Sequence, residues 1–202
     1  MTLSGHAEAL AASLAKANLV PGPAAELIPE GFTPTTKLDV SFDDKAVELG
    51  NFFRAGECKK APSIAFPAEA GAPSSAAYLL IFADPDAPTP DDPRYAFWRH
   101  WVVPGLQPLS PGPSRQTTLV AETKEPLTQY HPPGPQDLSK PHRYLFLLYR
   151  ESERLDLAKE DVGGEEFDER RSFKLAEFVK YHRLELVGVN WMTCAGDGWK
   201  EE

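Results

Sequence analysis

The sequence is poor in cysteine and in long apolar runs, and each shortage argues against a class of protein. Two cysteines, Cys58 and Cys194, lie far apart among 202 residues. No window approaches the roughly 18 to 20 apolar residues of a membrane-spanning helix, and the N-terminus lacks the basic start and apolar stretch of a secretory signal. We therefore expect reduced thiols, no stable membrane insertion and a cytoplasmic location.

Positive charge is also scarce. The chain has 30 acidic and 21 basic residues, a net charge of −9, and its lysines and arginines form no continuous stripe. Nucleic acids attract proteins through dense positive charge, so we do not expect a nucleic acid as a partner.

Common catalytic signatures are missing as well. We find no His-Glu-x-x-His or Cys-x-x-Cys pair for a metal, no Gly-x-Ser-x-Gly turn for acyl transfer and no glycine-rich loop for nucleotides. These absences favour a protein with no cofactor, no bound metal and no catalytic residue.

Apolar runs of strand length are plentiful, and most of the 20 prolines lie in the loops between them. Residues 77–83 and 144–150 are apolar on both faces, which is typical of central strands, and 97–103 resumes a strand between them. Shorter strands are predicted at 38–42, 46–53, 117–121 and 186–192.

Helical patterns occur only near the two ends of the chain. Residues 3–17 predict a short amphipathic helix with Ser4 as its N-cap, and 168–183 predict a second helix. Together with the strands, they indicate a mainly β protein with an antiparallel sheet or sandwich core, forming one domain over 1–202.

Ionisable side chains lie where the apolar strands begin and end. Asp84 and Asp86 follow the first strand, His100 lies in the next, and His142 and Tyr144 open the third. Alternation places His100 on the face of Trp98 and Val102, so we expect it to be at least half buried. If the strands are neighbours, these polar groups converge on one cavity.

Each group alone has an ordinary structural explanation, since Asp-Pro pairs start turns and strand histidines often lie in cores. Together, a carboxylate, two histidines and a tyrosine could form a pocket for phosphate or a phosphorylated headgroup. The same groups could instead bind a metal such as zinc, or serve as acid and base in a hydrolase. The residues alone leave these alternatives open.

Four motifs, in order along the chain, resemble the phosphatidylethanolamine-binding protein family, which includes the Raf kinase inhibitor proteins and the plant flowering regulators. They are Asp-Pro-Asp-Ala-Pro at 84–88, His-Trp-Val-Val at 100–103, Pro-His-Arg-Tyr at 141–144, and Phe173 with Phe178. The resemblance covers a core over 38–192. The sequences of residues 130–135 and 142–149 most resemble those of the fungal branch that contains the carboxypeptidase Y inhibitor.

The resemblance implies a central antiparallel sheet, a smaller sheet, and a pocket at one end for a phosphate-like or phosphoethanolamine-like anion. Under this resemblance His100 and His142 donate hydrogen bonds to the anion or polarise it, and Tyr144 donates its hydroxyl. Asp84 orients a histidine, and Gly134 leaves room for a backbone amide to approach the anion. The pocket residues carried over by motif are Asp84, Asp86, His100, Gly134, Pro135, His142 and Tyr144.

The resemblance also implies a non-enzymatic regulatory protein that acts on a protein partner, such as a serine carboxypeptidase or a kinase-pathway component. In the inhibitor branch the N-terminal segment engages the protease, so residues 1–20, within the N-terminal helical segment 1–23, become a candidate contact. Two departures from the family pattern stand out. The loop 136–140 is bulky and carries an extra acid, which predicts altered access to the pocket, and Arg99 stands where animal members often have a second histidine.

Overall fold

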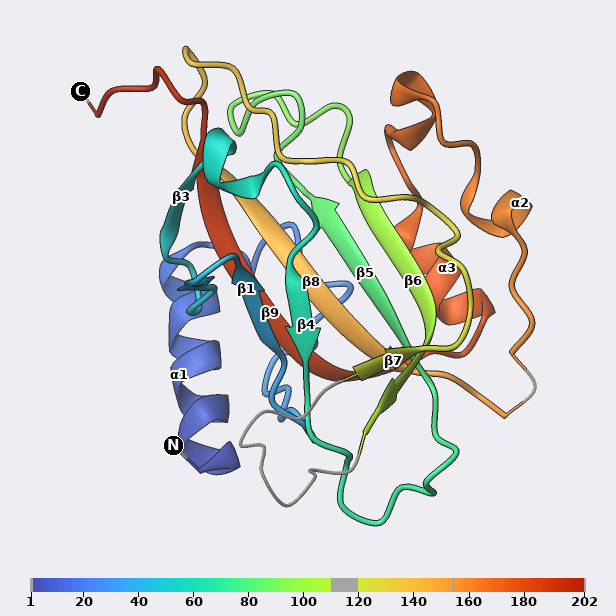
Figure 1. Cartoon of the computed structure of the whole chain (residues 1–202). Coiled ribbons are helices and arrows are strands. Elements are labelled where there is room, and N and C mark those ends of the chain that lie inside the picture. The colour runs from blue at the N-terminus through green and yellow to red at the C-terminus, as the bar shows by residue number, and fades with distance from the viewer. Residues whose placement is uncertain (1, 110–119, 154, 202) are drawn as a thin grey trace.

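The computed structural model describes residues 2–109, 120–153 and 155–201. The described part is mainly β, with a six-stranded and a three-stranded sheet (Figure 1). The large sheet has the order β3-β9-β8-β5-β6-β7 and the small one β2-β1-β4. The strands are β1 (Asp39–Phe42), β2 (Lys45–Ala46), β3 (Phe52–Arg54), β4 (Ser63–Ala65), β5 (Tyr78–Asp84), β6 (Trp98–Pro108), β7 (Val120–Glu122), β8 (His142–Arg150) and β9 (Glu185–Ala195).

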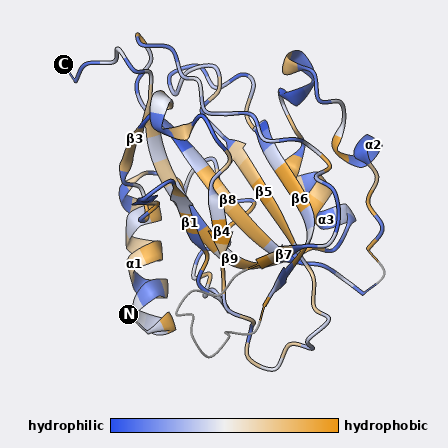
Figure 2. Ribbon diagram, viewed as in Figure 1, coloured by the Kyte–Doolittle hydropathy of each residue, from blue (hydrophilic) through white to orange (hydrophobic). Residues whose placement is uncertain are grey.

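The central strands are buried on both faces because helices cover one face and the small sheet covers the other. Leu79 and Ile81 of β5 pack in a cluster with α1 (Leu3–Lys16) and α3 (Leu175–Tyr181). Leu80 and Phe82 pack in a second cluster with β1. Figure 2 shows β5, β6 and β8 coloured as hydrophobic along much of their length, as two-sided burial requires.

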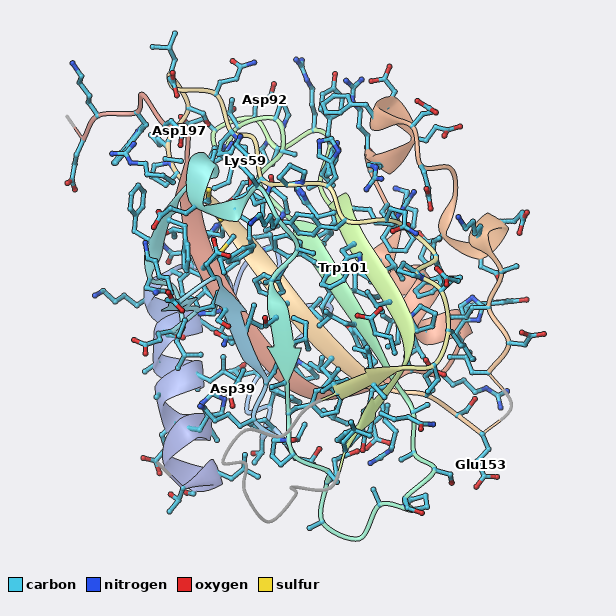
Figure 3. The ribbon with its side chains drawn as sticks, in the orientation of Figure 1. Asp39, Lys59, Asp92, Trp101, Glu153 and Asp197 are labelled. Carbon is cyan, nitrogen blue, oxygen red and sulfur yellow. The ribbon has the colours of Figure 1, made fainter. Side chains whose placement is uncertain are left out.

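Apolar side chains lie over the central strands, and charged side chains lie at the periphery. Trp101 lies over the central strands, whereas charged groups such as Asp92, Glu153 and Asp197 project from the periphery (Figure 3). Among the described helices, none has both the length and the apolar character needed to cross a bilayer.

The central sheet is antiparallel, as predicted, except at one edge. β3 pairs with β9 in parallel, with Phe53 opposite Cys194, so the sheet is mixed at that edge. The other pairs in the large sheet are antiparallel.

Several predicted boundaries were wrong for local reasons. The predicted strand at 46–53 divides into β2 and β3, because Leu49 (φ 46°) and Gly50 (φ 105°) turn the chain. The predicted helix at 168–183 divides at Ser172 (φ 52°) into a 3-10 turn, Phe167–Arg170, and α3. Thr2, not Ser4, caps α1: its hydroxyl accepts from the Gly5 amide at 3.2 Å.

Some elements were not predicted at all. β4, a 3-10 turn at Ala55–Cys58 and α2 (Lys159–Val162) are short and lack a clear apolar period. The strand predicted at 117–121 corresponds to β7 from residue 120 onward, and residues 117–119 lie outside the described part of the chain.

Candidate functional site

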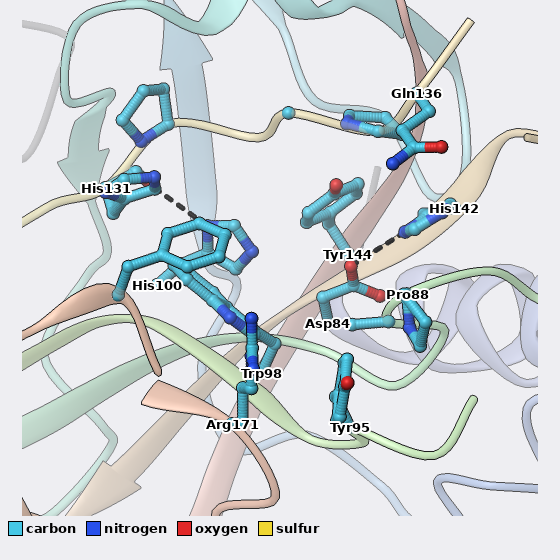
Figure 4. Close-up of a pocket in the computed structure, with 15 residues that line it drawn as sticks. Asp84, Pro88, Tyr95, Trp98, His100, His131, Gln136, His142, Tyr144 and Arg171 are labelled. Carbon is cyan, nitrogen blue, oxygen red and sulfur yellow. Dashed lines mark hydrogen bonds and ion pairs between the residues drawn. The ribbon is translucent and has the colours of Figure 1, made fainter. Parts of the chain in front are cut away.

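A pocket of about 290 Å³ lies where β5 ends and where β6 and β8 begin (Figure 4). Antiparallel pairing of β5 with both neighbours brings these three ends together, because β5 runs opposite to β6 and β8. The lining residues are Asp84, Ala87, Pro88, Tyr95, Trp98, His100, His131, Pro132, Gly134, Pro135, Gln136, His142, Tyr144, Phe167 and Arg171. Six of the seven sequence-predicted site residues are among them, and Asp86 is not.

Asp84 and His142 form a buried pair in this pocket. The Nδ1 of His142 lies 2.8 Å from Oδ2 of Asp84, and both side chains are at most 4% exposed. Burial raises the pKa of Asp84, while the hydrogen bond and the charge of His142 act in the opposite direction. The other Asp84 oxygen accepts from the Asp86 amide at 2.7 Å. Asp84 therefore orients this histidine, as its position in the motif suggested.

The second nitrogen of His142 also has a protein partner. Its Nε2 lies 3.0 Å from the Ser139 hydroxyl, which completes a chain from Ser139 through His142 to Asp84. The chain has the connectivity of a serine hydrolase triad. However, Ser139 is 5% exposed and lies outside the pocket lining. The chain therefore fixes the imidazole and presents no accessible nucleophile.

His100 reaches the pocket through a β-bulge. Phe82 pairs with Trp101 and Ala83 with Arg99, so His100 is the extra residue between them. The bulge corrects the predicted alternation, because Val102 packs on the helix side while His100 contacts Phe82 on the other face, at 5.1 Å between ring centroids. The predicted burial is confirmed at 4% exposure.

The imidazole of His100 is held in one orientation. Its Nδ1 lies 2.8 Å from the His131 carbonyl oxygen, and the rings of Trp98 and Tyr144 lie at centroid distances of 4.3 and 5.2 Å. Burial lowers the pKa of His100 to about 3, and the bond to the carbonyl offsets only part of that effect. The ring is therefore neutral near pH 7.

Asp86 lies beside the pocket and holds Arg143. Its Oδ2 accepts from the backbone amide of Arg143 at 2.7 Å and from Nε at 2.8 Å, and its Oδ1 accepts from Nη2. Arg143 also donates to the carbonyls of Ala17 and Asn18, just beyond α1. Asp86 therefore connects the loop after β5 to β8 and to the N-terminal helical segment.

Apart from the loop that begins at Gln136, the sequence motifs did not identify the residues at the mouth of the pocket. Arg171 lies with its guanidinium 4.5 Å from the Tyr95 ring and 5.5 Å from the Phe167 ring, both within cation–π range. His131 and Gln136 add polar groups from the loop before β8. None of these residues belongs to an apolar run, so no strand pattern could have found them.

The two departures from the family pattern differ in how close they lie to the pocket. In the loop 136–140, Gln136 lines the pocket, but Asp137 accepts from the Gly198 amide at 2.9 Å and so faces the C-terminal segment. Arg99 points to the face opposite His100 and lies 5.1 Å from the Phe173 ring. The extra acid and the extra base are therefore both outside the pocket.

Metal binding has no geometric support in the part of the chain that the structure describes. No group of three or more His, Cys, Asp or Glu side chains there could hold a metal ion. Cys58 and Cys194 are both buried and carry free thiols.

Known proteins share this architecture. A family model described as phosphatidylethanolamine-binding protein matches residues 39–190. Putative odorant-binding protein A5 of Drosophila melanogaster is 27% identical over 79% of this chain and 70% of its own length. Protein TERMINAL FLOWER 1 of Arabidopsis thaliana is 29% identical over 69% of this chain and 71% of its own.

Solved structures agree in fold at low sequence identity. Carboxypeptidase Y inhibitor, solved in complex with its cognate proteinase, superposes with a TM-score of 0.77 at 21% identity, covering 94% of this chain and 96% of that one. Phosphatidylethanolamine-binding protein from Plasmodium vivax gives 0.68 at 21% identity, covering 93% and 97%. The chain belongs to the phosphatidylethanolamine-binding protein family.

Proposed function

We propose that this chain is a non-enzymatic regulatory protein whose pocket binds a small phosphate-like or phosphoethanolamine-like anion, and that it acts by contact with a protein partner. The observation that carries the anion proposal is the charge of the pocket wall. Asp84 is the only carboxylate in the lining that the structure describes, and it is hydrogen-bonded to His142. Arg171 contributes a positive charge at the mouth.

Arg170 adds a second positive charge, buried next to the pocket wall at His100. Arg170 is 5% exposed, and its Nη1 donates to the carbonyls of Gln129 at 2.9 Å and His100 at 3.2 Å. Little water screens a charge at this depth, so it favours an anion in the pocket. Recognition by this short-range field is compatible with the net charge of −9.

Tyr144 supplies a donor that the protein itself does not use. Burial raises the pKa of its hydroxyl well above the usual range, so the proton stays in place. Within the described residues the hydroxyl makes no hydrogen bond, although it lines the pocket. A bound anion would satisfy it.

The size of the pocket limits the ligand. About 290 Å³ is at the lower end of the range for ligand sites, so the pocket suits a headgroup or a small anion and not acyl chains.

Titration with inorganic phosphate and phosphoethanolamine, followed by NMR of the His100 and His142 rings, tests the anion proposal. We expect both rings to shift at millimolar ligand, and unmoved resonances would refute it. Tyr144→Phe should weaken binding about tenfold, the usual loss for one hydrogen bond to a charged group. Tyr149→Phe is a matched control, because the Tyr149 hydroxyl is buried without a partner in the described structure and lies outside the pocket lining.

The partner we propose is a serine carboxypeptidase or a kinase-pathway component, in a reducing compartment such as the cytoplasm. The similarity in fold to the carboxypeptidase Y inhibitor supports the first choice. Leu10 and Leu14 anchor α1 in the core, so deleting the helix would expose apolar surface. The better test substitutes exposed groups of α1.

An inhibition assay against a serine carboxypeptidase should compare the whole chain with Leu3→Asp and with Glu8→Lys. Both side chains are exposed on α1, so loss of inhibition would report a lost contact and not a lost fold. Lys60→Glu, an exposed change outside α1, is the control. Absence of inhibition by the unmodified chain would reject the carboxypeptidase.

A further inference from the structure

The hydrogen bond between His100 and His131 fixes which nitrogen of His100 carries the proton. A backbone carbonyl oxygen can only accept, so Nδ1, at 2.8 Å from it, must donate. In a neutral ring the other nitrogen, Nε2, then carries a lone pair and acts as an acceptor. Figure 4 shows the free side of the His100 ring turned away from His131, toward the middle of the pocket.

The surroundings of His100 keep the ring neutral. The ring is 4% exposed and packs against Phe82 and Trp98. Asp84, the carboxylate in the pocket, is bonded to His142 and not to His100. The pKa of about 3 follows from burial first and then from the positive or titratable neighbours. The ionisable groups near it on each neighbouring element are Asp84 on β5, His142 and Tyr144 on β8, His131 in the loop after β7, and Arg170 and Arg171 in and just beyond the 3-10 turn.

Nε2 of His100 has no hydrogen-bond partner among the residues that the structure describes, although it lies in the pocket wall. A fully ionised oxyanion would place its own lone pairs against this nitrogen, which is repulsive. A ligand that brings a proton would form a hydrogen bond there instead.

We propose that the pocket selects an oxyanion that carries its own proton, namely the monoanion of a phosphate monoester. Its P–OH group donates to Nε2 of His100, while its charged oxygens accept from donors such as the Tyr144 hydroxyl. A phosphodiester has no O–H to donate, and a monoester dianion has lost it. The inference rests on the proposed anion site and narrows the ligand class.

Calorimetric titration of the full chain with methyl phosphate and dimethyl phosphate, at pH 6 and pH 8, tests this selection. The second pKa of a monoester is about 6, so its monoanion falls from about half to about one hundredth of the total between these pH values, and the apparent affinity should fall about 50-fold. Dimethyl phosphate keeps one charge throughout. At pH 6 we expect dimethyl phosphate to bind at least about tenfold more weakly than methyl phosphate, because it leaves the buried acceptor, Nε2 of His100, unsatisfied.

Two results would overturn the inference. Dimethyl phosphate binding as tightly as methyl phosphate at pH 6 would show that no ligand proton is needed. A similar decline of both ligands with pH would assign the proton to a protein histidine. If neither ligand binds at any pH, the proposed anion site itself fails, which is a distinguishable outcome.

His100→Gln offers an amide that can donate, so this variant should bind the two ligands with similar affinity. If the variant does not fold, nitrogen-detected NMR of the unmodified protein replaces it. The Nε2 signal of His100 should be that of an unprotonated nitrogen without ligand and should move on adding methyl phosphate but not dimethyl phosphate. A protonated Nε2 in the free protein would contradict the proposal.

The monoester could belong to a free metabolite or to a lipid, and competition distinguishes the two. Glycerol 3-phosphate and vesicles containing phosphatidic acid present the same group from a soluble and a lipid source. Displacement of methyl phosphate by either supports the monoester class and identifies the source. Displacement by neither would contradict the class.

Discussion

The contact between Asp86 and Arg143 separates a structural role from a ligand-binding role at the Asp-Pro-Asp motif. Asp86 is 1% exposed and receives three hydrogen bonds from Arg143, one from its backbone amide and two from its guanidinium. Asp86→Ala removes all three and leaves the guanidinium without its carboxylate. Arg143 remains 21% exposed in its side chain, so water recovers part of the loss.

Removing one partner of a fully buried ion pair costs about 3 to 5 kcal/mol. Partial exposure of Arg143 places the expected cost at the lower end, about 3 kcal/mol of the free energy of unfolding. For a chain of this length that cost corresponds to a fall in Tm of roughly 6 to 12 °C. Urea denaturation measures the loss directly, and a double-mutant cycle with Arg143→Met should give a coupling of about 1 to 3 kcal/mol.

Asp91→Ala is a matched control on the same loop. Asp91 pairs with Lys140, but both side chains are at least 67% exposed, so its removal should change stability by less than about 1 kcal/mol. Folded Asp86→Ala should lose less affinity for methyl phosphate than Tyr144→Phe loses, relative to the unmodified chain. A stable Asp86→Ala that has lost binding would refute this argument and return Asp86 to the ligand site.

Acid should destabilise the protein through His100, because the pKa of this histidine is lower in the folded state than in the unfolded chain. The free energy of unfolding should therefore be unaffected by His100 above about pH 6.5 and should fall by up to about 1.4 kcal/mol per pH unit below it. Urea curves from pH 7 to 4 should show this slope, reduced in His100→Gln, and equal slopes would contradict it. Gly50→Ala should cost about 2 kcal/mol or more in urea denaturation, because φ is 105° and a Cβ would lie 2.3 Å from the Trp191 ring. Gly134→Ala should change stability by less than about 0.5 kcal/mol, since no atom lies within 4 Å of an added Cβ. The same variant should bind methyl phosphate more weakly in calorimetry, because the added methyl group enters the pocket. Unchanged affinity would place Gly134 outside the site.

Strand periodicity predicted much of the fold because the central strands are buried on both faces. Continuous apolar runs such as 77–83 have few alternative structures, and the polar residues at their ends converge once the strands pair. The parallel edge strand β3 could not be predicted in this way, since three residues carry no directional signal. Two-residue alternation likewise could not anticipate the bulge that separates His100 from Val102.

Loop residues of the site were beyond prediction for a different reason. Arg171 lies far along the sequence from Tyr95, and its guanidinium reaches the Tyr95 ring only because the 3-10 turn packs beside β6. The sequence around Arg171 mixes acidic and basic residues and gives no sign of a pocket. Asp86 was carried over into the predicted pocket with its motif, but the two carboxylates have different partners, His142 for Asp84 and Arg143 for Asp86.

This acidic chain keeps two buried cations in and beside the strand that carries His100. Arg99 and Arg170 are both buried, and their guanidinium groups donate mainly to the backbone, to the carbonyls of Gly164 and Gln129 among others. Burial lowers the pKa of Arg99 to about 10, which still leaves it charged at pH 7. The charge of Arg170 also opposes protonation of His100. In the proposed anion site, Arg170 would therefore have two effects: it would favour an anion in the pocket, and it would help to hold the nearest histidine in the neutral form that requires the anion to bring a proton.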